Sequence, residues 1–246
     1  MRRFAMIVFL AALLAAVAFA QKQPKAWDQW SEKDAMKVLN GSGWGQTQTE
    51  TDTSQMFFSP TSDPGNSRRT SNDSSRNAQG ATNQAVYVNF HVRFFTAKPI
   101  RQALVRMIEL QQKDLPKETL DRLNVFASLR SDDWIIVSVA FDASDQRYAQ
   151  PVTQAFGLVT TDLAKNYTYL ERKDGKKVYL NEYVPPGKDG FGARFIFPRL
   201  VDGQPFLTAD AGEVRFYSQF EVGSKSLKLD RRYKTADMMY DGQLEY

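Results

Sequence analysis

The chain contains a single histidine, His91, and an imidazole is the side chain best suited to acid–base chemistry near neutral pH. It lies in the stretch AVYVNFHVRFF, from Ala85 to Phe95. A metal site built from imidazoles needs a second histidine, and a Ser-His-Asp triad would have to use this one. Alternation along the stretch places His91 on the more polar face of a strand, between Asn89 and Arg93. We interpret it as a sheet-face histidine and assign no catalytic residue and no metal ligand.

Carboxylates are the second group of side chains that can do chemistry. Two acids that face each other across a cleft can hydrolyse a glycosidic bond. The sequence does not reveal which acids face each other, so a carboxylate-dependent hydrolase, possibly carbohydrate-active, stays an alternative. The candidate acids are Asp132, Asp133, Asp142, Asp145, Asp162, Glu171, Glu182, Asp210 and Glu213.

Motifs of the common catalytic and nucleotide-binding sites are absent from the sequence. It contains no G-x-S-x-G, no H-E-x-x-H, no G-x-x-x-x-G-K-[ST] and no G-x-G-x-x-G that opens a helix. The glycine-rich GKDGFG at 187–192 lies between expected strands, which favours a turn over a phosphate-binding loop. We expect no cofactor and leave enzymatic activity open, with a non-enzymatic role favoured.

Cysteine is absent, which excludes disulfides, thiolate metal sites and thiol nucleophiles. The net charge is +4, and +2 remains once Arg2 and Arg3 are set aside. Acids and bases are interspersed, without the basic stripe that nucleic-acid binding requires. The densest basic segment, Lys225 to Lys234, is typical of a solvated strand and turn. We expect no nucleic-acid partner.

The first twenty residues have the features of a secretory signal peptide. Arg2 and Arg3 precede an apolar run from Met6 to Phe19, and small residues follow near Ala20, where we expect cleavage. No later run is long and apolar enough for a transmembrane helix. The sequence therefore predicts a secreted or periplasmic protein of the bacterial envelope, with residues 1–20 removed.

Residues 21–44 predict a short amphipathic helix flanked by tryptophans. Ser31 and Asp34 have the spacing of an N-terminal capping box. Trp27, Trp30 and Trp44 surround the helix, and aromatic residues of this kind contribute strongly to binding at interfaces. We predict that these three bind a protein partner or an envelope surface. The alternative is that they dock the helix on the main domain.

Residues 45–84 are rich in Ser, Thr, Asn, Gln, Asp, Gly and Pro, interrupted only by the apolar triplet Met56 to Phe58. Such a segment buries too little apolar surface to offset its ordering entropy. We expect a flexible, disordered polar linker here, followed by a single α+β domain over residues 85–246.

Alternation and turn residues predict the elements of that domain. Lys98-Pro99 and Pro116 are expected to start the two helices of a hairpin. Arg147 to Phe156 has helical features that Pro151 interrupts. From Tyr167 onward the pattern is repeatedly that of strands, with four Asp-Gly pairs at the turns. The expected fold is α+β, a mostly antiparallel, β-rich sheet or sandwich with a helical hairpin in the N-terminal half.

Centring the clearest turn on Asp174-Gly175 predicts that Leu170 pairs with Tyr179 and Glu171 with Val178.

Two segments, WDQWSEKDAMKVLNGSGWGQTQTE and YKTADMMYDGQLEY, resemble uncharacterised secreted bacterial proteins of unknown function. The resemblance covers only the chain ends and implies an envelope location. It transfers no catalytic residue.

These observations favour a secreted, non-enzymatic envelope protein that binds a partner or belongs to an assembly. The hydrolase named above is the first alternative. A small outer-membrane β-barrel is the second, because the terminal aromatic residues of MMYDGQLEY resemble the last strand of such proteins.

Overall fold

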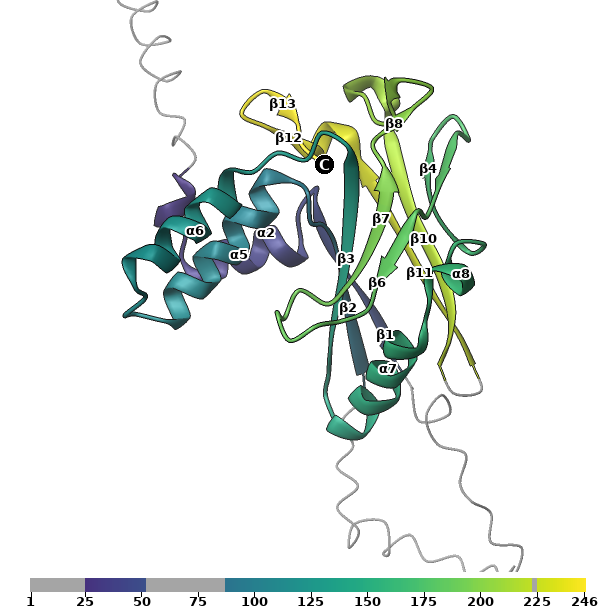
Figure 1. Ribbon diagram of the computed structural model, residues 1–246, viewed down its shortest axis with the longest axis horizontal. Helices are drawn as coiled ribbons and strands as arrows, with labels where there is room; N and C mark the ends of the chain where they lie inside the picture. Colours follow the sequence, from purple (N-terminus) through teal and green to yellow (C-terminus); the bar gives the residue numbers. More distant parts are fainter. Residues whose placement is uncertain (1–24, 52–86, 223–224) are drawn as a thin grey trace, which may run out of the picture.

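The fold is that of two antiparallel sheets packed face to face, as seen in the computed structural model, which describes residues 25–51, 87–222 and 225–246 (Figure 1). The expected α+β class with antiparallel sheets is confirmed. The five-stranded sheet has the order β1 (Gly45–Thr51), β2 (Tyr87–Phe94), β3 (Trp134–Ala143), β7 (Ala193–Pro198), β6 (Glu182–Val184). The four-stranded sheet has the order β11 (Lys225–Lys234), β10 (Glu213–Val222), β4 (Thr168–Arg172), β5 (Lys177–Tyr179).

Two short ribbons complete the strands. They pair β8 (Leu200–Val201) with β9 (Gln204–Pro205) and β12 (Met239–Tyr240) with β13 (Gln243–Leu244). Both enclose an Asp-Gly pair in which each residue has a positive φ, as a two-residue hairpin turn requires. These two turns follow the sequence prediction.

The expected helical hairpin consists of α5 (Lys98–Gln111) and α6 (Lys117–Ser128). It packs beside α2 (Glu32–Asn40) on one side of the five-stranded sheet (Figure 1). The helices α7 (Gln146–Leu158) and α8 (Thr161–Ala164) follow β3 at another end of the sandwich. Short 3₁₀ turns span Trp27–Gln29 (η1), Ala209–Ala211 (η2) and Thr235–Met238 (η3). None of the helices in the described ranges is long and apolar enough to cross a membrane.

Alternating aromatic residues form the core between the sheets. Phe195 and Phe197 of the first sheet pack edge-on against Phe216 of the second, with centroids 5.4 and 6.3 Å away. Phe94 meets Tyr233 in the same way at 4.9 Å. All five side chains are buried, so aromatic contact between the sheets stabilises the sandwich.

The β1 strand lies where the sequence predicted the start of the linker, so that prediction is wrong for residues 45–51. Alternation places Gln46 and Gln48 on the inner side of β1, where they reach the edge of β11. Gln48 Nε2 donates to the carbonyl of Lys228 at 2.7 Å, and its Oε1 accepts from the amide of Asp230 at 3.0 Å. Gln46 Nε2 donates to the carbonyl of Arg232, and its Oε1 accepts from the guanidinium of Arg231. The backbone ladder with β2 on one side and side-chain amides toward β11 therefore hold this polar strand in place. Residues 52–84 of the predicted linker lie outside the described residues.

The hairpin between β4 and β5 is one residue away from its predicted register. Leu170 pairs with Val178 and Glu171 with Lys177. Only Gly175 of the Asp-Gly pair has a positive φ, so the chain forms a three-residue loop instead of a two-residue turn. Because a one-residue shift exchanges the two faces of a strand, it decides that Val178 is buried and Tyr179 exposed.

Candidate functional site

The candidate site begins where β4 stops short of its neighbour β10. On one side, β11 pairs with the whole of β10, from Glu213 to Val222. On the other side, β4 pairs only with Val214 to Ser218. Within the described part of the chain, residues 219–222 thus lack a strand on the β4 side.

The alternation of hydrogen bonds along the ladder identifies which backbone groups of residues 219–222 point toward the β4 side. The amide of Lys173 donates to the carbonyl of Glu213, so the odd-numbered residues of β10 direct both backbone groups toward β4. Gln219 and Glu221 continue this phase beyond the end of β4. Before β4, the amide of Tyr167 donates to Ala164, while the pairing of Ser218 with Thr168 leaves the Tyr167 carbonyl facing the amide of Gln219. No hydrogen bond of standard geometry between described residues engages the backbone of Gln219 or Glu221 from this side.

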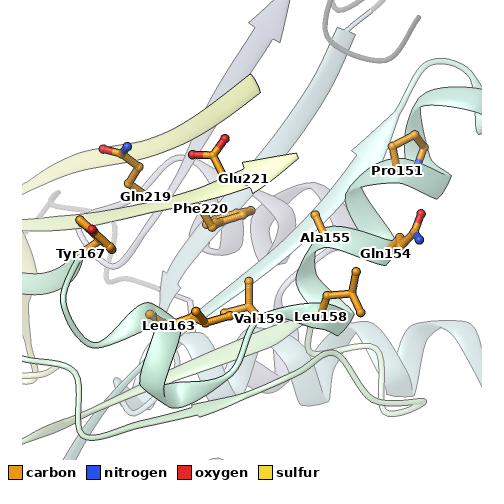
Figure 2. A pocket seen from close by; sticks show the side chains of 11 residues that line it. Pro151, Gln154, Ala155, Leu158, Val159, Leu163, Tyr167, Gln219, Phe220 and Glu221 are labelled. Carbon is orange, nitrogen blue, oxygen red and sulfur yellow. The ribbon is translucent and has the colours of Figure 1, made fainter. Parts of the chain in front are cut away.

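A groove of about 740 Å³ runs beside this free edge. Figure 2 shows β10 on one side of it and α7 and α8 on the other. The volume is within the range of small-molecule and peptide-sized sites, roughly 300–1,000 Å³. The groove is lined by Pro151, Gln154, Ala155, Leu158, Val159, Leu163, Ala164, Tyr167, Gln219, Phe220 and Glu221.

The floor of the groove is fixed by the aromatic core. Phe220 packs edge-on against the buried Phe156 of α7, with centroids 4.7 Å apart. Phe156 in turn stacks on Phe141 of β3 at 5.8 Å. The hydroxyl of Tyr183 donates to the Phe156 carbonyl at 2.6 Å, and burial raises the pKa of that hydroxyl, which keeps it a donor. Through Phe156, α7 is therefore anchored to both sheets beside the groove.

The rim of the groove is apolar and exposed. Leu158 is 68% exposed, Leu163 64% and Tyr167 56%. Among the lining residues, Glu221 provides the carboxylate, and Gln154 and Gln219 provide amides. Large exposed apolar side chains around a concave surface are typical of a binding site. The arrangement can bind an apolar group and place polar or positively charged groups beside Glu221.

His91 lies elsewhere, on the outer face of the five-stranded sheet. Its Nε2 lies 2.5 Å from Oδ2 of Asp142, and its Nδ1 lies 3.0 Å from Oγ1 of Thr47. Burial lowers the pKa of the imidazole, the hydrogen bond to Asp142 raises it, and nearby Arg93 lowers it further. Asn89 also donates to Asp142. The predicted sheet-face position thus holds, but Thr47 was missed because it lies in the segment expected to be a linker.

The hydroxyl of Thr47 donates to the carbonyl of Asn40 at 3.3 Å. Imidazole, hydroxyl and carboxylate are therefore in contact across β1, β2 and β3, yet they are not among the residues that line the groove. Several of the acids considered as catalytic candidates form ion pairs with basic side chains, among them Asp132, Asp162, Glu171 and Glu213.

The three tryptophans predicted to bind a partner lie apart from the groove. Trp44 packs on the core, and its Nε1 donates to the carbonyls of Met238 and Glu245 near the C-terminus. Trp30 also packs on the core, and its carbonyl accepts from Arg106 of α5. Trp27 is half-buried in η1, which contacts α5. The structure thus gives docking roles to Trp30 and Trp44, and partner binding by the three stays a prediction.

Sequence reasoning missed the groove because its features depend on the ends of paired strands. The described residues contain no group of three or more potential metal ligands. No protein-family model, curated protein or solved structure matches the chain.

Proposed function

We propose that the protein is a secreted, non-enzymatic binding protein of the bacterial envelope and that the groove between β10, α7 and α8 is its binding site. The groove carries this proposal, because it combines a rigid aromatic floor with exposed leucines at the rim. The proposed location rests on the apolar, arginine-initiated start of the sequence.

The chemistry of the lining supports binding over catalysis. Its ionisable side chains are the carboxylate of Glu221 and the phenol of Tyr167. A hydrolytic centre needs a nucleophile or activated water with a general base beside it. The groove instead presents apolar surface whose burial by a ligand is favourable by roughly 25 cal/mol per Å².

Titration with the neutral, environment-sensitive dye Nile red tests the groove. We expect saturable fluorescence enhancement at one dye per chain. Leu158→Asp, which places a charge on the exposed rim, is expected to weaken binding at least about tenfold. The matched control is Leu129→Asp, another exposed leucine at the end of a helix, α6, outside the groove. Dye binding that is absent, or equally strong in both variants, would contradict the proposal.

A further inference from the structure

We propose that the occupant of the groove is an extended peptide segment of another protein, which adds as a short strand to the free edge of β10 at Gln219 and Glu221. This inference rests on the proposed function and specifies the ligand of the same site. In this mode, backbone hydrogen bonds provide affinity, and pockets for alternate side chains provide specificity.

The unpaired backbone groups are the first support. Gln219 and Glu221 each direct an N–H and a C=O toward the groove, in the phase that pairs with β4 a few residues earlier. Spaced two residues apart, these groups match the repeat of a second strand. A lipid chain or another ligand without peptide groups would cover these donors and acceptors without bonding to all of them, which is costly.

The contrast with the other edge of the same sheet is the second support. The outer edge of β11 faces Gln46 and Gln48, whose side-chain amides bond to its backbone. Covering strand edges is the common protection against unwanted pairing. At residues 219–222 of β10, apolar side chains of α7 and α8 lie across the groove instead. Such a surface suits a peptide strand, because its N–H and C=O groups can bond to the free edge of β10.

The apolar floor of the groove and the charge of Glu221 indicate which side chains the bound peptide should carry. The floor of the groove, formed by Phe220, Ala155 and Val159, accepts aliphatic side chains. Glu221 is exposed on the opposite, outer face of the strand edge. A segment with apolar residues toward the floor and a basic residue near Glu221 is therefore favoured over an acidic one.

The probe is a fluorescein-labelled peptide, Thr-Lys-Val-Leu-Val-Lys-Thr, titrated against the full chain by fluorescence anisotropy. Two N-methylated versions test backbone pairing. One carries methyl groups on the amides of both valines, and the other on the amides of the leucine and both lysines. Because the N–H groups of a strand alternate in direction, only one version loses the amides that face β10.

The N-methylated peptide that loses the amides facing β10 is expected to bind at least about tenfold more weakly than the parent peptide. The other N-methylated peptide is expected to bind within about threefold of the parent. Replacing both lysines of the peptide by glutamate is expected to weaken binding to the native chain, and Glu221→Gln to reduce that difference.

A proline variant provides the matching test in the protein. Gln219→Pro removes an N–H that faces the groove and places the proline ring where the peptide backbone would lie. Gln219→Ala keeps this N–H and measures what the side chain contributes. The proline variant is expected to bind the peptide at least about tenfold more weakly than Gln219→Ala.

The results separate the two proposals. If Nile red binds but the peptide does not, or if both N-methylated peptides bind like the parent, strand addition is wrong and the groove takes a ligand of another class. If neither the dye nor the peptide binds, the proposed function and strand addition both fail. Loss of peptide binding in Gln219→Ala as well as Gln219→Pro would assign the effect to the side chain and overturn backbone pairing.

Discussion

His91 and Asp142 lie side by side on adjacent strands, with Nε2 and Oδ2 only 2.5 Å apart. The imidazole is largely buried, whereas the carboxylate is 55% exposed, so water screens the attraction between them. Burial is the largest influence on the imidazole, and the pKa of His91 is lowered from its ordinary value of 6.5.

The lowered pKa of His91 predicts how stability depends on pH. The unfolded chain takes up a proton near pH 6.5, before the folded protein does, so the folded state loses stability as the pH falls below about 6.5. Because the chain has one histidine, its imidazole proton signal in NMR is unambiguous. We expect an NMR titration midpoint below 6.5 in the folded protein. A midpoint above 6.5 would show that the contact with Asp142 outweighs burial.

Asp142→Asn tests the same contact in a second way. The change removes the negative charge and the hydrogen bond that raise the pKa of His91. We expect the NMR midpoint to fall further. As a control, Asp132→Asn removes an exposed acid paired with Arg130 and should leave the midpoint unchanged.

Gln48→Ala is expected to destabilise the sandwich by about 1–3 kcal/mol, because it removes two hydrogen bonds to the backbone of β11. Thr51→Ala, at the exposed end of the same strand, is the control and should change stability by less than about 0.5 kcal/mol. Urea unfolding measures both. Equal stability of the two variants would mean that the Gln48 amide does not hold β1 against β11.

A proline pair tests the strand edge itself, without any ligand. Tyr217 and Gln219 share a face and a hydrogen-bond phase, but only Tyr217 has a partner on β4. We expect Tyr217→Pro to be at least about 1 kcal/mol less stable than Tyr217→Ala, because a ladder hydrogen bond is lost. Gln219→Pro should lie within about 1 kcal/mol of Gln219→Ala. A large penalty at residue 219 would show that its amide is already paired.

Trp44→Ala is expected to destabilise the protein by about 3–5 kcal/mol. The indole holds two carbonyls near the C-terminus and packs edge-on against Tyr240 at 5.9 Å. The neighbouring Gly43 lies so close that a Cβ would be 1.9 Å from the Asp237 carbonyl oxygen. Thermal unfolding checks the expected loss, and a fully stable variant would contradict the docking role.

The tryptophan prediction from the sequence therefore needs single substitutions. Alanine at all three positions would confuse partner binding with the docking of Trp30 and Trp44. Trp27→Ala avoids this, since η1 contains no buried residue. If Trp27 binds a partner, this variant should lose that partner while its thermal unfolding stays close to that of the native chain.

Several local features could be predicted from the sequence because they depend on neighbouring residues. The capping box formed by Ser31 and Asp34 is present, and Pro99 lies in the first turn of α5. Alternation correctly placed Phe90 inside and His91 on the more polar face of β2. Pro151 was expected to interrupt a helix, yet it lies within α7, because packing against β3 and β10 stabilises that helix.

The sequence by itself determined the alternation of the strands, the helix starts and the mixed α+β class, since these follow from side-chain size and backbone preferences over a few residues. Only the tertiary structure decided that Gln48 would complete the edge of β11 and that β4 would end before Gln219. Both depend on hydrogen bonds between segments far apart in the chain. Whether a backbone group is paired is a property of its neighbour in space, and the sequence does not state which segment that neighbour is.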